Sequence, residues 1–257
     1  MFIKFIKIIF YVSLISLISS CGTTQKFDEN KASLKMQLGV SHLENDNLPL
    51  ALKELLEAEQ LDPKSALIQN NLGLVYFLRK KMDLSLAHYT KATELNPQFT
   101  EAKNNLARVY IEVKQYQKAE VLLKQVVEDL TYPNQASAFM NFGLMRFNQK
   151  RFMDAKTLFR KVLENAREYC YAQVYLGRSF LEMGENPDAV IQLEKAIPLC
   201  IPRMVDEAHY YSAIAHYRLG QKEKSLARFQ EAVRLFPDGP NVQSSKQMIL
   251  IIKKGSK

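Results

Sequence analysis

The sequence predicts an all-α solenoid of about six helix-turn-helix repeats, closed by a C-terminal helix. Of the 257 residues, 47% are hydrophobic and 24% are charged, with only 9 Gly and 9 Pro. This balance is typical of an ordered protein with a sizeable core. In addition, a small residue recurs at steps of 34 or 36 residues through most of the chain. These small residues are Gly39, Gly73, Ala107, Gly143, Gly177 and Ala213.

The period of 34 residues is that of the tetratricopeptide repeat, a pair of helices called A and B. Pro63 and Pro97 are also 34 residues apart, at positions where a proline would end helix B. The chain therefore resembles this repeat family, and the resemblance implies a right-handed superhelical solenoid in which each repeat covers its neighbour's apolar face. The expected repeats span about 32–65, 66–99, 100–135, 136–169, 170–205 and 206–240, and residues 241–257 form a capping helix with a basic tail.

The N-terminal segment, residues 1–20, has the pattern of a secretory signal peptide. Lys4 and Lys7 precede an apolar stretch over residues 8–18, which is shorter than the roughly 18 to 20 residues needed to cross a bilayer. A retained transmembrane anchor is the weaker alternative. The small residues that follow lead directly to Cys21.

The segment that ends at Cys21 resembles the lipobox of bacterial lipoproteins. The resemblance implies that the thiol of Cys21 carries a diacylglyceryl group and that its new amino group carries a further acyl chain such as palmitate. Several acyl chains would hold the protein at the membrane almost permanently without spanning it. Residues 21–31 would then be the lipidated N-terminus and a flexible spacer, and Gly22 is compatible with sorting to the outer membrane. The alternative is an ordinary signal peptide with an incidental cysteine.

The sequence contains no motif for catalysis, metal binding or phosphate binding. The three cysteines form no CxxC pair, and His42, His209 and His216 occupy repeat positions where packing residues are expected. The net charge of +8 is spread along the chain instead of forming the basic patch that nucleic-acid binding requires. We therefore expect a protein that is not an enzyme, with no cofactor, no metal, no nucleic-acid partner and no small-molecule substrate.

The predicted partner-binding surface is the groove lined by the A helices, because solenoids of this kind bind peptides there. By analogy with the repeat family, four positions of each A helix point into the groove, and in the first two repeats they are mainly apolar. Asparagine recurs at one repeat position, at Asn71, Asn105 and Asn141, and would bond a partner's backbone; the alternative is a local role, because asparagine is common there in the repeat family. The alternative for each residue is burial in the core by the adjacent helix. The predicted groove residues are Met36, Val40, Leu43, Leu67, Asn71, Leu74, Phe77 and Asn105.

Cys170 is expected to open helix A of the fifth repeat and Cys200 to end its helix B. Since the two helices of a repeat run antiparallel, these ends should lie close together. A disulfide is favoured in an oxidising periplasm. The alternative is two buried free thiols.

The combination of a lipobox, a short spacer and six repeats resembles the type IV pilus biogenesis and stability lipoproteins, the PilW/PilF group. The most specific local match is Tyr132-Pro133, followed by the segment from Phe139 to Leu144. The resemblance implies a pilotin: a lipoprotein of the outer membrane, facing the periplasm, that binds secretin subunits and promotes their localisation and multimerisation. The alternatives are a general periplasmic scaffold for envelope assembly and a module that recruits a peptidoglycan hydrolase.

Overall fold

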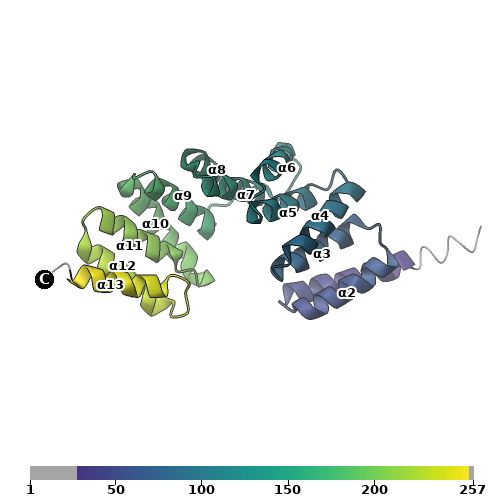
Figure 1. The fold of residues 1–257 in the computed structure, drawn as a ribbon, viewed down its shortest axis with the longest axis horizontal. Helices are drawn as coiled ribbons and strands as arrows, with labels where there is room; N and C mark the ends of the chain where they lie inside the picture. The colour runs from purple at the N-terminus through teal and green to yellow at the C-terminus, as the bar shows by residue number, and fades with distance from the viewer. Residues whose placement is uncertain (1–27, 255–257) are drawn as a thin grey trace, which may run out of the picture. The chain divides into compact units, whose positions relative to one another are not determined.

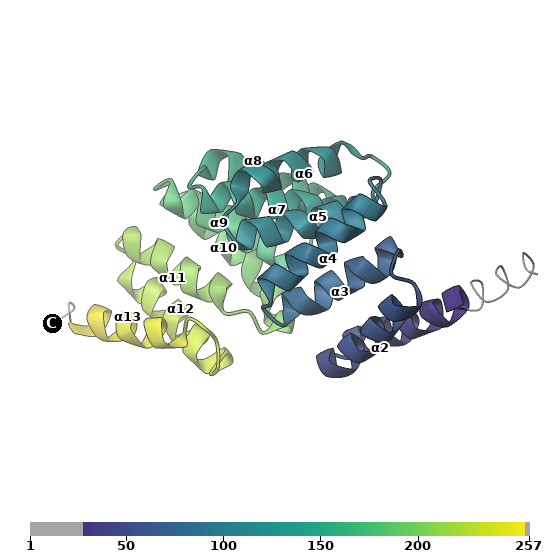
Figure 2. The same cartoon turned by 45° about the vertical axis from the view of Figure 1, so that its right-hand side comes forward.

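The computed structural model describes residues 28–254, so the predicted signal peptide, Cys21 and the first part of the spacer lie outside the described residues. Within 28–254 every regular element is a helix, which confirms the all-α prediction (Figures 1 and 2). The chain divides into two compact units, which we call unit 1, ending at Val113, and unit 2, beginning at Lys114. Each unit is described on its own.

Unit 1 consists of successive helices joined by short turns. Its N-terminal helix covers residues 28–44 of the described range, so residues 28–31 are helical and not part of a flexible spacer as predicted. Asp28 and Glu29 are acidic residues at the start of this helical stretch, where negative charge is favourable. The following helices are α2 (Leu48–Leu61), α3 (Ala66–Leu78), α4 (Met82–Leu95) and α5 (Thr100–Glu112).

Unit 2 contains three helix pairs that pack side by side, α7 with α8, α9 with α10, and α11 with α12 (Figure 1). A single turn of 3-10 helix, η1, separates α10 from α11. The elements are α6 (Tyr116–Glu128), α7 (Gln135–Asn148), α8 (Phe152–Asn165), α9 (Cys170–Glu182), α10 (Asn186–Cys200), η1 (Ile201–Arg203), α11 (Glu207–Arg218), α12 (Lys222–Leu235) and α13 (Val242–Lys254).

The recurring small residue allows the two helices of a pair to approach closely. A Cβ atom added to Gly73 would lie 2.7 Å from Cδ1 of Tyr89, a ring that is fully buried. Gly143 meets Phe159 in the same way in unit 2, at 2.6 Å. In both helix pairs the aromatic residue follows the glycine by 16 residues. One repeat position therefore leaves space between the two helices, and the side chain at the other position fills that space.

The turn between the two helices of each pair also follows the repeat, because one residue in it has a positive φ angle. The last two pairs of unit 2 use Gly184 (φ 78°) and Gly220 (φ 73°). Earlier pairs place side-chain-bearing residues in this left-handed conformation, which favours glycine. These residues are Asp46, Lys80, Lys114 and Lys150.

Helix α13 covers the apolar face of the last pair, as the predicted cap requires. Ile252 is 3% exposed and packs with Ala213 of α11 and Phe229 of α12. Leu250 and Ile251 lie on the outer side of α13 and are exposed. Across residues 28–254, no helix combines the length and apolar character needed to cross a membrane.

Candidate functional site

The A-helix face of unit 1 is formed by the first helix of each pair, and the predicted groove residues have different environments on it. Met36 and Leu43 pack against the core of unit 1, which contains Leu55 and Leu72. Both side chains are half-buried, so they lie at the edge of this core and stay partly exposed. Leu67, by contrast, is 46% exposed at the start of α3. The remaining apolar members of the predicted set, Val40, Leu74 and Phe77, are half-buried.

Phe77 of α3 lies beneath an arginine that sequence reasoning did not connect with it. The Cζ atom of Arg108, on α5, is 4.1 Å from the centroid of the Phe77 ring, which is a cation–π distance. The Nε and Nη2 atoms of Arg108 are buried and have no hydrogen-bond partner among residues 28–254. The same arginine lies close enough to buried Tyr89 to counteract part of the pKa increase that burial gives this phenol.

One of the two predicted asparagines makes a bond inside unit 1. The side-chain amide of Asn105 donates to Oδ1 of Asn70, which is 2% exposed, at 3.1 Å. This bond links helices α3 and α5. Asn71 is half-buried on α3. The side-chain amide of Asn105 therefore makes a structural contact between neighbouring A helices, and it is not free to bind a partner in the way that the sequence predicted.

A polar cluster holds the first two pairs of unit 1 together. Nε2 of fully buried Gln69 donates to Glu59 at 2.8 Å, and Nζ of Lys91 lies 3.1 Å from the same carboxylate oxygen. Burial alone would raise the pKa of Glu59, but these two hydrogen bonds outweigh it and lower the pKa. His88 contacts Oε1 of Gln69 at 2.8 Å, and burial lowers its pKa. The groups satisfy one another, so the cluster is structural.

The A-helix face of unit 2 carries an arginine surrounded by aromatic rings. The Cζ atom of Arg178, on α9, lies 4.9 Å from the ring centroid of Phe147 and 4.6 Å from that of Tyr175. It also lies 4.3 Å from the ring of Tyr211. The three rings come from α7, α9 and α11, so three successive A helices contribute to one cluster. We call Arg178 with Phe147, Tyr175 and Tyr211 the arginine cluster.

The arginine cluster was not predicted from the sequence, although a signal for it exists. Arg108 and Arg178 are 70 residues apart, and so are Phe77 and Phe147. In each unit an arginine therefore follows its phenylalanine by 31 residues and stacks on it. An alignment of each repeat with the second repeat after it places the two arginines at one position and the two phenylalanines at another.

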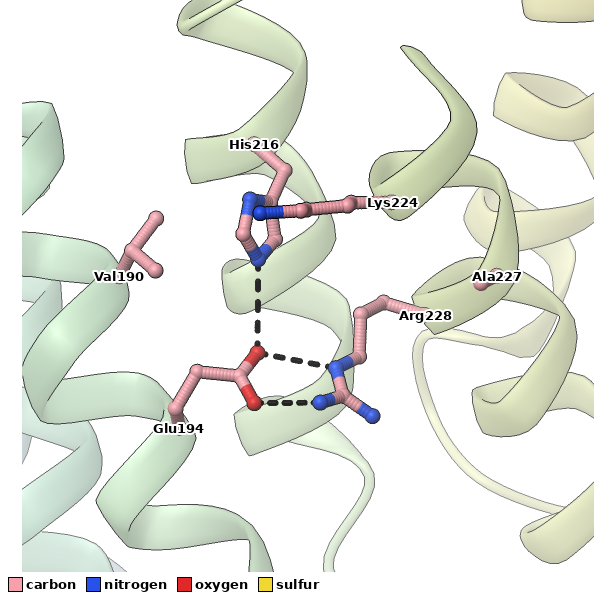
Figure 3. A pocket seen from close by; sticks show the side chains of 6 residues that line it. All are labelled: Val190, Glu194, His216, Lys224, Ala227 and Arg228. Carbon is pink, nitrogen blue, oxygen red and sulfur yellow. Dashed lines mark hydrogen bonds and ion pairs between the residues drawn. The ribbon is translucent and has the colours of Figure 1, made fainter. Parts of the chain in front are cut away.

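A second polar cluster lines a hollow of about 490 Å³ between α10, α11 and α12 (Figure 3). The carboxylate of Glu194 accepts two hydrogen bonds from Arg228, one of them from Nε at 2.9 Å, and a third from Ser212 at 2.6 Å. His216 approaches it to 3.5 Å. Burial would raise the pKa of Glu194, but the bonds from Arg228 and Ser212 lower it overall. Because the carboxylate of Glu194 already accepts three hydrogen bonds, we interpret the cluster as a structural contact between the α9–α10 pair and the α11–α12 pair.

Cys170 and Cys200 form a disulfide in the structure, with their Cα atoms 5.1 Å apart. The bridge connects the first residue of α9 to the last residue of α10. Both cysteines are buried. The described part of the chain contains no group of three His, Cys, Asp or Glu side chains arranged to hold a metal ion.

The two units differ in charge. Residues 28–113 carry 10 Lys and Arg against 12 Asp and Glu, whereas residues 114–257 carry 22 against 15. The positive charge of the protein therefore belongs to unit 2. A partner with acidic groups is favoured there over unit 1.

Three models of the tetratricopeptide repeat match the sequence, over residues 66–99, 88–121 and 206–238. The first of these ranges contains α3 and α4, and the third contains α11 and α12. A search of curated proteins finds no match to the chain.

Several solved structures share the fold over most of the described chain. A structure from a functional characterisation of Pseudomonas aeruginosa PilF is 21% identical, has a TM-score of 0.70, and is matched over 86% of this chain and 98% of its own. The structure of PilW, described as a widely conserved type IV pilus biogenesis factor, is 19% identical with a TM-score of 0.76, over 83% and 97%. YrrB, described as a repeat protein with an unusual peptide-binding site, is 18% identical with a TM-score of 0.57, over 78% and 97%.

At these identities the structures share the fold with this chain, while the repeat models identify its building block. Proteins built from this repeat are scaffolds for protein–protein interaction, with a surface presented by successive A helices. The three matches identify tetratricopeptide repeats at residues 66–121 and 206–238, and the stacked helix pairs agree with this repeat.

Proposed function

We propose that the chain is a lipid-anchored binding module of the type IV pilus system, a pilotin that binds secretin subunits at the outer membrane and promotes their multimerisation. The observation that carries the proposal is the fold shared with PilF and PilW across almost their whole length. The lipobox-like sequence that ends at Cys21 supports it independently, because it supplies a membrane anchor without a spanning helix.

In this proposal, the acyl chains on Cys21 confine the protein to the inner leaflet of the outer membrane, with the repeats in the periplasm. The A-helix face of unit 1 supplies a docking surface, because Leu67 is exposed and Phe77 and Leu74 are only half-buried. A bound apolar segment of a secretin subunit would gain roughly 25 cal/mol for each Å² of apolar surface that it buries. Binding and localisation then occur together, and no catalytic step is required.

A matched pair of variants tests the docking surface. Leu67 on α3 and Leu84 on α4 are each 46% exposed and each lies in the first turn of its helix. An aspartate is well tolerated in a first turn, so both variants should fold. We expect Leu67→Asp to reduce co-purification of the secretin from solubilised envelopes and to reduce secretin multimers in cells, whereas Leu84→Asp changes neither.

The membrane anchor is tested separately. Cys21→Ala should leave the helical circular dichroism unchanged and release the protein from the outer-membrane fraction. If the variant stays in that fraction, the lipid anchor is excluded. If a strain that lacks the protein keeps its secretin multimers, and no secretin co-purifies with the wild type, the pilotin function is excluded and a general periplasmic scaffold or a hydrolase recruiter is favoured.

A further inference from the structure

The guanidinium of Arg178 is held in place by rings and not by acidic partners. Its Cζ atom lies 4.3 to 4.9 Å from three ring centroids, one on each of α7, α9 and α11. Cation–π attraction to these rings holds the guanidinium in place and requires no hydrogen bond from its N–H groups. The rings thus position the arginine without using its hydrogen-bonding capacity.

That capacity is unused within the described chain. The Nε atom of Arg178 is buried and lacks a hydrogen-bond partner, and no carboxylate of residues 28–254 forms an ion pair with this arginine. Glu207 on α11 is the acidic group near enough to interact with it electrostatically. The two Nη atoms of Arg178 are not buried and form no hydrogen bond within residues 28–254, so they can donate to an acceptor on another molecule.

Two other arginines of unit 2 that are at least half-buried lie on carboxylates and show the contrast. Arg146 donates two hydrogen bonds to Glu120, and Arg228 donates two to Glu194. Within the same unit, therefore, two guanidiniums have their carboxylate inside the fold and Arg178 does not. A guanidinium fork matches a carboxylate geometrically, and unit 2 has an excess of positive charge.

An exposed aromatic side chain continues this surface along α9. Tyr171 is 41% exposed and precedes Arg178 by seven residues, which is two helical turns, so the two residues lie on the same side of the helix. An extended segment that runs along α9 contacts Tyr171 and Arg178 in turn.

We propose that the arginine cluster of unit 2 is a binding site for the side-chain carboxylate of a glutamate or aspartate within a partner's extended segment. The two Nη groups of Arg178 donate to the two carboxylate oxygens, while Tyr171 contacts an apolar residue close to the acid in the same segment. This site is separate from the docking surface on unit 1 and does not depend on the partner being a secretin.

The test uses short peptides of defined chemistry. The first probe is the pentapeptide Ser-Leu-Glu-Leu-Ser with acetylated and amidated ends, and the second has Gln in place of Glu. In NMR titrations that observe the Nε–Hε signal of Arg178, the Glu peptide should shift the signal saturably. The Gln peptide should bind at least roughly ten-fold more weakly, since a hydrogen bond to a charged group is lost. A third probe, the Gln peptide with a free C-terminal carboxylate, distinguishes the two sources of a carboxylate.

Variants separate recognition from folding. Arg178→Lys keeps the charge but loses the fork, so we expect it to bind the Glu peptide about ten-fold more weakly while its thermal unfolding stays cooperative. Arg234→Lys, on the exposed side of α12, makes the same exchange outside the cluster and should bind as the wild type does. Absence of binding by the Glu peptide, equal binding of the Glu and Gln peptides, a preference for the free C-terminus, or equal affinity of the two variants would each overturn the proposal.

Discussion

In unit 1, Arg108 lies over the ring of Phe77. In unit 2, the equivalent ring of Phe147 belongs to a group of three rings around Arg178. The same two repeat positions therefore supply a phenylalanine and an arginine in both units, but the rings that adjacent A helices add around the arginine differ. The comparison teaches that a repeat fixes where a side chain lies, whereas its neighbours on adjacent A helices fix what it can bind.

The two units also differ in how their helices are held together. The described ion pairs of unit 1 are made by lysines, Lys35 with Glu54 and Glu57, and Lys91 with Glu59. Unit 2 has two-point pairs from arginines and, in addition, the disulfide. A planar guanidinium loses less freedom per hydrogen bond than a lysine side chain does. We therefore expect unit 2 to depend on a few strong links and unit 1 on its apolar core.

The largest expected difference concerns the disulfide, which closes a separation of 30 residues. Replacing both Cys170 and Cys200 by Ala should lower the free energy of opening unit 2 by roughly 3 to 4 kcal/mol in the chain-entropy model. Native-state hydrogen exchange of peptides from α9 and α10 measures this change, and peptides from α3 and α4 serve as the internal control. An equal loss of protection in both units would contradict the independent stabilisation of unit 2.

A smaller, pH-dependent difference concerns Glu120, whose pKa the hydrogen bonds from Arg146 lower to about 2. A carboxyl whose pKa is lower in the folded state stabilises that state above its unfolded pKa, here 4.5, and loses this contribution as the pH falls towards 2. Glu120→Gln should therefore destabilise unit 2 by about 2 kcal/mol at pH 7, because Arg146 keeps one amide oxygen as an acceptor but loses the charged carboxylate that accepts both of its hydrogen bonds.

The difference between the wild type and Glu120→Gln should then shrink between pH 4.5 and pH 2, as the wild-type carboxyl becomes protonated. Urea unfolding of both proteins across this range measures it. A difference that does not vary with pH would show that the Arg146–Glu120 pair contributes packing alone. Lys124, which also contacts Glu120 at 3.1 Å, can be replaced by Gln to separate its smaller share.

The smallest expected effect concerns the turns with positive φ. Lys80 in unit 1 has φ 59°, and Gly184 in unit 2 has φ 78° with no atom within 4 Å of an added Cβ. Lys80→Gly should stabilise unit 1 and Gly184→Lys should destabilise unit 2, each by about 1 kcal/mol, since only glycine adopts this conformation without steric cost. Thermal unfolding of the two single variants and of the double variant measures the effects. If both single variants change the stability in the same direction, the backbone conformation at these two positions does not determine the stability change.

The helix pairs could be predicted from the sequence because single residues recur with the period of the repeat. A glycine paired with a large residue 16 positions later, as in Gly73 and Tyr89, is visible as a period without any knowledge of the third dimension. The closeness of Cys170 and Cys200 also followed from the antiparallel course of one pair. Both inferences concern contacts within a repeat, where the backbone leaves little choice.

Contacts between repeats could not be predicted in the same way. Met36 and Leu43, on the predicted binding face, are half-buried against the core, and Asn105 bonds to Asn70. Whether a residue on an A helix is covered depends on the next A helix, whose rotation and distance are set by the whole packed interface.

By itself, the sequence determined the helical class, the pairing of helices and the residues that make each pair close-packed, because these depend on local spacing along the chain. The tertiary structure decided that Arg108 and Arg178 stack on aromatic rings with N–H groups left unpaired. The reason is that a guanidinium interacts with the side chains that lie within about 5 Å of it. Which side chains these are depends on how three successive helices pack, and not on the spacing of residues along the chain.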